Sequence, residues 1–130
     1  MRFTRKIGDT VHMTHTVGEM DLATFETGTV HPFYGTFALG RDVEWACRQF
    51  VLEMKDEDEE GIGTFLNINH RSPALLGQTV TIVATLERLE GNSVDCSFQV
   101  LVKDRLIAEG TQGQKILKKS KVEQIKQQFG

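Results

Sequence analysis

The sequence predicts an α+β protein in which an antiparallel sheet covers one long helix. Two observations carry this prediction: apolar residues recur with helical spacing over 36–55, and runs of alternating residues follow between 63 and 117. The chain has 130 residues, of which 39% are hydrophobic and 25% charged, a composition typical of a folded protein and not of a disordered one. Because this length is typical of one domain, we expect residues 1–130 to form a single domain.

The N-terminal region shows the weakest pattern. Residues 7–17 alternate loosely between apolar and polar side chains, which predicts a strand. Residues 18–32 contain glycines and a proline and have little periodicity. We therefore expect a loop or an irregular segment there.

The helix over 36–55 has the clearest pattern. Its apolar residues recur every three or four positions and so share one face: Leu39, Val43, Ala46, Cys47, Phe50, Val51 and Met54. Because Cys47 lies in this stripe, we expect it to fill the core rather than to act as a nucleophile. The acidic run 56–60 follows. Acidic side chains oppose the dipole at a helix C-terminus, so we expect the helix to end here and the run to be a solvated loop.

Four strands are predicted after the helix. The first covers 63–70 and ends before Pro73, and the others cover 78–89, 94–102 and 105–117. Residues 90–93 and 103–104 are typical turns between them. In the last strand, Gly110 and Gly113 indicate bulges or close backbone approaches. Ser120 and Glu123 form the pattern of a capping box, which predicts a short C-terminal helix.

The long helix has a wide apolar face, and only the sheet is available to bury it. An antiparallel sheet wrapped around one central helix, with a short C-terminal helix, is the hotdog fold. We therefore predict this architecture. Hotdog domains usually pair edge to edge, which leaves fewer open strand edges, so we expect a homodimer.

Composition and motifs exclude several functions. The net charge of −3 gives no basic face for nucleic acid. No run approaches the roughly 18 apolar residues of a membrane span, so no membrane partner is expected. No Gly-rich phosphate loop, HExxH, CxxC or GxSxG motif occurs.

The histidines and cysteines do not indicate a metal site or a disulfide framework. His12 and His15 lie three positions apart on a predicted strand and so point to opposite faces, and we therefore do not expect them to share an ion. Cys47 and Cys96 are too few for a disulfide framework, and no apolar signal segment follows the basic N-terminus. We expect a cytoplasmic protein with reduced thiols.

Glu44 is a candidate site residue because it flanks the apolar stripe of a helix that the sheet should cover. Limited access of water would raise the pKa of this carboxyl unless a partner compensates the charge. The structural alternative is that the side chain extends to solvent or forms an ion pair with Arg41 or Arg48, each about one turn away. The pattern alone does not choose between these interpretations.

Thr36 and His70 are further candidates, each with a structural alternative. Thr36 stands where the helix begins, so it could be the N-cap. Alternatively, its hydroxyl and the free amides of the first turn could act on a carbonyl group. His70 ends a predicted strand, where a histidine is more often structural, but its ordinary pKa suits a general base.

Several stretches together resemble the fluoroacetyl-CoA thioesterase family of hotdog proteins. They are 7–9 (IGD), 44–47 (EWAC), 63–70 (GTFLNINH), 77–82 (GQTVTI) and 109–111 (EGT). The family uses a threonine, a glutamate and a histidine together, and the resemblance assigns these roles to Thr36, Glu44 and His70. Gly63 corresponds to a glycine that contacts the acyl end of the substrate.

The resemblance implies hydrolysis of a small acyl-CoA thioester. His70 would act as the base toward Thr36 or a water molecule, and Glu44 would orient His70 or attack the carbonyl. Amides after Thr36 would stabilise the oxyanion. No metal or redox cofactor is implied, and CoA enters as part of the substrate. Segment 18–32 and the last strand depart from the fluoroacetyl-selective member, so that acyl group is not implied.

Two other functions remain open at this level. An acyl-CoA hydratase or dehydratase would typically need an Asp/His pair, and the helix carries Glu44 with Thr36 nearby instead. A non-catalytic acyl-CoA-binding module would keep the pocket, and replacing Thr36 would cost it nothing. Fold alone does not decide among the three.

Overall fold

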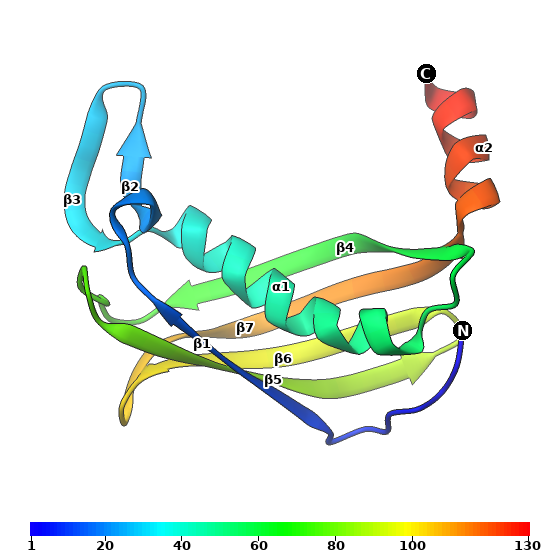
Figure 1. Cartoon of the computed structure of the whole chain (residues 1–130), viewed down its shortest axis with the longest axis horizontal. Helices are drawn as coiled ribbons and strands as arrows, with labels where there is room; N and C mark the ends of the chain where they lie inside the picture. The colour runs from blue at the N-terminus through cyan, green and yellow to red at the C-terminus, as the bar shows by residue number, and fades with distance from the viewer.

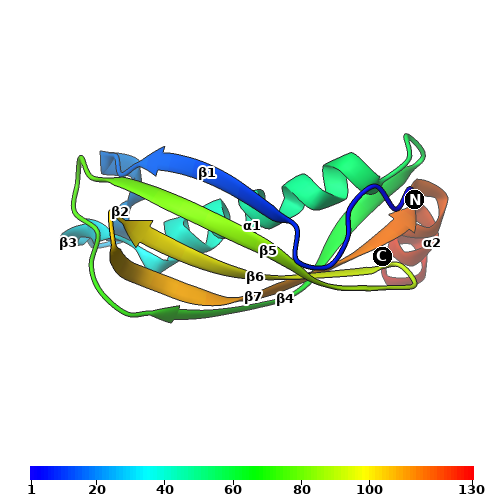
Figure 2. The same ribbon diagram turned by 90° about the horizontal axis from the view of Figure 1, so that it is seen from below.

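The computed structural model describes residues 1–130 as a curved sheet that carries one long helix in its concave face (Figure 1, Figure 2). The strands and helices follow each other along the chain as β1 (Thr10–Thr16), a 3-10 turn (Glu19–Asp21), β2 (Leu22–Phe25), β3 (Gly28–Tyr34), α1 (Thr36–Met54), β4 (Glu59–His70), β5 (Thr79–Glu90), β6 (Ser93–Val102), β7 (Arg105–Lys118) and α2 (Lys119–Phe129). This is the predicted hotdog fold.

The main sheet has the strand order β1-β5-β6-β7-β4, and all of its neighbours are antiparallel. The long strands β5, β6 and β7 form its middle, as the alternating pattern predicted. β1 and β4 are its two edges. The functional candidates Gly63 and His70 both lie on the edge strand β4.

The core lies between α1 and the inner face of the sheet. The predicted helical stripe is buried, from Leu39 to Met54, and Cys47 is part of it. Inward residues of β5 and β6 pack against it, including Ile82 and Phe98. The predicted core of the helix and the inward face of β5 are therefore confirmed. No helix has the length and the apolar sequence needed to cross a membrane.

The prediction of a loop over 18–32 is wrong, because β2 and β3 form a hairpin there. Its strands are short and most of their side chains are not buried, so no alternation between a core face and a solvent face marks them. Gly28 has φ 111°, a conformation that favours glycine, and it starts the second strand of the hairpin. The hairpin projects beyond the main sheet beside the N-terminal end of α1 (Figure 1).

The acidic run is not entirely a solvated loop, since β4 begins at Glu59. Glu59 is buried and accepts a hydrogen bond from the N–H of Asp56 (2.8 Å). Glu60 forms an ion pair with Arg48 (2.5 Å). Specific partners thus hold two of the five acidic residues inside the fold.

The predicted capping box does not form. α2 begins at Lys119 with Lys118 as its N-cap, and no side chain caps it. β7 continues directly into this helix, so Ser120 lies inside the first turn rather than before it. α2 buries no residue and extends away from the sheet (Figure 1).

A bulge in β4 places both ends of this strand against the helix. The register with β7 shifts between Gly63 and Phe65, so Thr64 is the extra residue. Without the shift, Gly63 and His70 would face opposite sides of the sheet, because their positions differ by an odd number. With it, both face α1. Gly113 leaves room at this point, since a Cβ there would lie 2.2 Å from a ring carbon of Phe65.

Candidate active site

Thr36 is the first residue of α1, and Gly35 is the N-cap. The structural alternative, in which Thr36 caps the helix, is therefore wrong. The N–H of Gly35 donates to the carbonyl of Asp21 (2.8 Å), which fixes the entry into the helix. The Thr36 hydroxyl is free for another partner.

That partner is His70. Thr36 Oγ1 and His70 Nδ1 lie 3.0 Å apart, a hydrogen-bond distance across 34 positions of sequence. The two residues meet because β4 runs antiparallel to α1 and ends beside the N-terminus of the helix (Figure 1). His70 is half-buried and Thr36 is exposed, so solvent can reach the hydroxyl.

The surroundings of His70 favour its neutral form. Burial lowers the pKa of its imidazole, and the nearby charge of His31 lowers this pKa further. Both histidines line a cavity of about 360 Å³ together with Thr36 and Phe33. A neutral imidazole can accept a proton from a hydroxyl group or from water.

The N-terminus of α1 places hydrogen-bond donors next to Thr36. The first intrahelical bond runs from the N–H of Leu39 to the carbonyl of Gly35 (2.9 Å). The amides that precede Leu39 have no partner within the helix. Such amides carry partial positive charge and can stabilise an oxyanion.

Glu44 lies apart from this pair, eight residues further along α1 or about 12 Å along the helix axis. It is exposed in the single chain and has no ion-pair partner. Arg41 pairs instead with Asp21 (2.9 Å) and with Asp42 (3.1 Å). Neither the limited access of water nor an ion pair with Arg41 or Arg48 is found, and the exposed carboxylate fits the alternative in which the side chain extends to solvent, because this side of α1 faces the open edge of the sheet.

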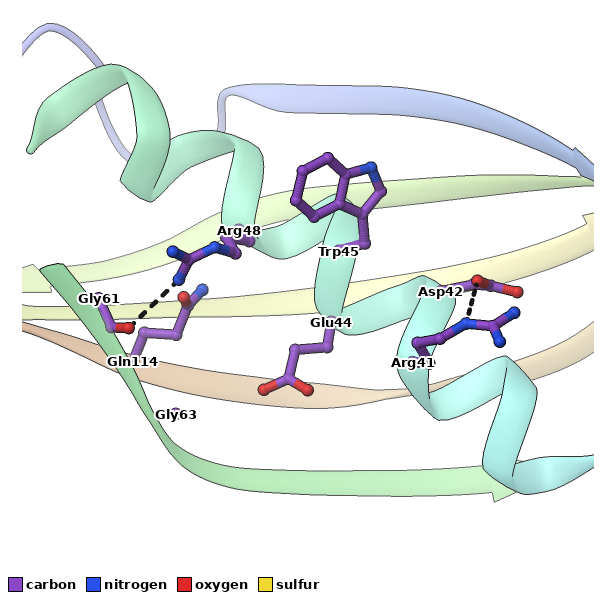
Figure 3. A pocket seen from close by; sticks show the side chains of 8 residues that line it. All are labelled: Arg41, Asp42, Glu44, Trp45, Arg48, Gly61, Gly63 and Gln114. Carbon is purple, nitrogen blue, oxygen red and sulfur yellow. Dashed lines mark hydrogen bonds and ion pairs between the residues drawn. The ribbon is translucent and has the colours of Figure 1, made fainter.

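Gly63 lies directly opposite Glu44 (Figure 3). A Cβ on Gly63 would be only 2.9 Å from Glu44 Oε1, so the absence of a side chain makes room for the carboxylate. Both residues line a cavity of about 560 Å³ between α1 and β4, which Trp45, Arg48 and Gln114 also line. Gly61 and Gly63 leave this cavity open on the side of β4.

The four predicted residues thus form two pairs in one chain: Thr36 with His70, and Glu44 with Gly63. Gly63 and His70 are seven residues apart on one strand, which corresponds to about 23 Å. Glu44 therefore cannot orient the His70 of its own chain. The sequence placed all four residues correctly on their elements but could not show this separation.

A third polar cluster joins β1, the 3-10 turn and α1. His15 Nε2 lies 2.7 Å from Asp21 Oδ2 and 3.5 Å from Asp42 Oδ2. The Tyr34 hydroxyl also donates to Asp42, and Gly18 N–H donates to Asp21 (2.8 Å). The side chains of His15, Asp21 and Asp42 lie close enough together to hold one ion. However, hydrogen-bond donors of the chain already bind both carboxylates. The cluster ties the hairpin and α1 together.

Sequence patterns gave no sign of two further features of the site. His31 follows Val30 in a stretch without periodicity, and only the fold brings it to the cavity of His70. Gln112 and Gln114 alternate inward on β7 at positions where apolar residues are usual. Two glutamines at successive inward positions of a predicted strand are the signal that could have indicated a buried polar pair.

The fold is a hotdog fold, and comparison with known proteins identifies the family. Residues 17–120 match the family described as FlK, fluoroacetyl-CoA-specific thioesterase. The chain belongs to this family, and its membership identifies it as a thioesterase. No match was found among curated protein sequences.

Solved structures agree with this assignment. A hypothetical protein of Thermus thermophilus, a thioesterase superfamily member, is 33% identical over 95% of this chain and 92% of its own, with a TM-score of 0.89. A hot-dog-like protein from Thermanaerovibrio acidaminovorans is 23% identical, with a TM-score of 0.88 over 100% of this chain and 98% of its own. A mutant of FlK is 19% identical, with a TM-score of 0.87 over 97% and 98%. The last two show the fold alone.

Proposed function

We propose that this protein hydrolyses small acyl-CoA thioesters, with Thr36, His70 and Glu44 as the reacting groups. The observation that carries the proposal is the 3.0 Å contact between Thr36 Oγ1 and His70 Nδ1 at a helix N-terminus. A hydroxyl group, a neutral imidazole and free amides meet there, as acyl transfer to water requires. Relatives support the substrate class, since mutants of FlK have been solved with acetyl-CoA and with fluoroacetate and CoA.

In the proposed reaction His70 accepts a proton from Thr36 or from water, and the resulting oxygen nucleophile attacks the thioester carbonyl. Charge develops on the carbonyl oxygen, where first-turn amides of α1 stabilise it. The carbon–sulfur bond then breaks, and CoA leaves as a thiolate that takes up the proton from His70. Where Thr36 is the nucleophile, the acyl group is left as a threonine ester, which a water molecule deprotonated by His70 then hydrolyses. The net reaction consumes one water and yields a carboxylic acid and a free thiol. It needs no metal ion or redox cofactor, and CoA takes part only as substrate.

Glu44 joins this site in a homodimer. β4 is an open sheet edge with exposed apolar residues, including Phe65 and Leu66, and a second copy is the natural partner for such an edge. Two antiparallel β4 strands related by a two-fold axis between Leu66 and Asn67 bring the partner's His70 close to Gly63. Neighbouring strands are about 4.8 Å apart, so Glu44 then lies beside the partner's Thr36–His70 pair.

In this arrangement Glu44 either orients the partner's His70 or attacks the carbonyl to give an anhydride that water then opens. Gly63 contacts the acyl end of the substrate. Each dimer holds two such sites. The free thiols of Cys47 and Cys96 fit a reducing compartment, and we place the protein in the cytoplasm.

Free-thiol release from a panel of short acyl-CoA thioesters tests the proposal. We expect turnover by the wild type, a loss of at least about a hundredfold in His70→Ala, and no change in His12→Ala. His12 is the matched control because it is exposed on β1, on the far side of the sheet order from β4. Binding of CoA species without any thiol release would contradict hydrolysis and support a binding module.

A further inference from the structure

Two glutamines are buried under α1 where the core is otherwise apolar. Gln112 is 0% exposed and Gln114 is 2% exposed, both on the inner face of β7. Gln114 Nε2 donates to Gln112 Oε1 (3.2 Å). Gln112 Nε2 has no partner. Because buried amides without partners are costly and rare, this pair needs an explanation beyond the packing of the core.

Gln114 reaches the cavity of Glu44, and Figure 3 shows both side chains entering it from opposite sides. Gln114 Oε1 accepts no hydrogen bond within the chain. It stays accessible because Gly61 has no side chain, and a Cβ there would lie 3.4 Å from this oxygen. If both side-chain amides were rotated, Gln112 Nε2 would donate to Gln114 Oε1. Gln114 would then present its Nε2 to the cavity instead of its Oε1. The pair therefore presents either an acceptor or a donor to the cavity.

Every charged side chain that lines this cavity has an ion-pair partner, except Glu44. Arg48 donates to Glu60 Oε1 (2.5 Å) and to the carbonyl of Gly61 (3.2 Å). Arg41 is held by Asp21 and Asp42. Glu44 alone has no counter-ion, so the cavity offers no free cation to an anionic acyl group and would repel it.

We propose that this cavity selects short acyl groups that carry a neutral hydroxyl, and rejects both plain alkyl and carboxylated acyl groups. The inference rests on the proposed function, because it places the acyl end beside Gly63. A hydroxyl has one donor hydrogen and an acceptor oxygen, so it can donate to Glu44 while it accepts from Gln114 Nε2 in the rotated orientation of the amides, or donate to Gln114 Oε1 in the other orientation. An alkyl group would leave the buried amide and the carboxylate without partners. Sites built in this way reject the analogue that lacks the polar group.

Two isosteric substrate pairs test this selectivity in the wild-type protein. Glycolyl-CoA differs from propionyl-CoA, and 3-hydroxypropionyl-CoA from butyryl-CoA, by a hydroxyl in place of a methyl group. We expect kcat/KM to favour the hydroxylated member of each pair at least about tenfold, and malonyl-CoA to be the poorest of the five. A wild type that prefers propionyl-CoA or malonyl-CoA overturns the inference.

The double variant Gln112→Met, Gln114→Met assigns the preference to these residues. Methionine keeps nearly the same volume, and replacing both amides leaves neither one unpaired. We expect the preference for hydroxylated substrates to fall at least about tenfold. Gln99→Leu, an exposed glutamine on β6, is the control and should keep the wild-type ratio.

The outcomes separate this inference from the proposed function. If His70→Ala abolishes turnover but the wild type does not discriminate within each pair, the thioesterase stands and the inference fails. If the double variant turns over substrates with an unchanged ratio, these glutamines are not the selecting groups and the inference fails. If no thioester in either panel is hydrolysed, the proposed function fails.

Discussion

Thr36 Oγ1 lies 3.0 Å from Nδ1 of His70 within one chain. The same chain places Glu44 against Gly63, seven residues earlier on β4. Each chain therefore carries the two pairs at separate positions along its edge strand, and in the proposed dimer two copies would complete both sites. The predictions below test the chemistry of each half and the contacts that hold them.

The hydroxyl of Thr36 should matter for turnover and not for stability. Thr36→Val removes the hydroxyl at nearly constant shape, and we expect kcat to fall at least about tenfold. Thr36→Ser keeps the hydroxyl and should retain most of the activity. Because Gly35 and not Thr36 caps the helix, neither variant should lose the roughly 1 kcal/mol of a lost cap. Thermal melts beside the kinetics check this, and a large drop in Tm for Thr36→Val would restore the capping role.

The pH profile should report the environment of His70. Burial and the charge of His31 lower its pKa from the ordinary value near 6.5. The neutral base is therefore available down to lower pH, and the acid limb of kcat/KM should fall below pH 6.5. His31→Asn removes the second positive charge, so it should move this limb toward higher pH. An acid limb that stays in place in His31→Asn would exclude the proposed interaction between the two histidines.

Gly63 should tolerate no side chain. In Gly63→Ala the new Cβ would meet Glu44 Oε1 at 2.9 Å and displace the carboxylate. We expect kcat/KM to fall about tenfold or more while the fold is retained, because a small misplacement of a reacting group is costly. Gly18→Ala is the control, since its Cβ would make only an ordinary 3.6 Å contact with Asp21. Full activity in Gly63→Ala would remove Glu44 and Gly63 from the site.

Asp21 should contribute to stability as an anion. Burial raises the pKa of this carboxyl, but hydrogen bonds from Gly18, His15 and Arg41 outweigh that effect and hold the pKa below its ordinary value. A lowered carboxyl pKa means that its contribution is complete above the unfolded pKa near 3.9 and is lost as the pH falls below it. Asp21→Asn should lower the free energy of unfolding at pH 7 by about 1–3 kcal/mol. Chemical denaturation of the variant and the wild type at pH 7 measures this, and equal stability would contradict it.

The elements that were predicted correctly are those with one buried face, because burial sets the spacing of their apolar residues. The stripe from Leu39 to Met54 and the alternation in β5 each face one core, so the sequence pattern and the structure agree. The hairpin over 22–34 was missed because only its ends, Leu22 and Tyr34, pack against the core, so it has no such period. The capping box failed because β7 runs without a break into α2. Local signals are weak where a neighbouring element determines the backbone.

The residues of the site were predicted individually, but their arrangement in space was not predicted. Thr36, Glu44, Gly63 and His70 were identified from resemblance, and the structure confirms only where they lie. Their separation into two pairs depends on the antiparallel course of β4 along α1 and on the bulge at Thr64. The course of β4 leaves no mark in the sequence, whereas the bulge lies opposite Gly113, which was predicted to mark a bulge or a close backbone approach. The expected partners of Glu44 failed for a related reason, because Asp21 and Glu60 reach the two arginines from distant segments.

Complementation between two inactive variants tests the shared site most directly. Glu44→Ala and His70→Ala are purified separately, mixed in equal amounts under conditions that allow subunit exchange, and assayed for thiol release. In a mixed dimer one site carries both changes and the other carries neither. Random exchange makes half of the dimers mixed, so activity should recover to about a quarter of the wild-type value. If the wild type is active but the mixture stays as inactive as each variant alone, Glu44 and His70 do not act together across two copies, and the proposed site is wrong.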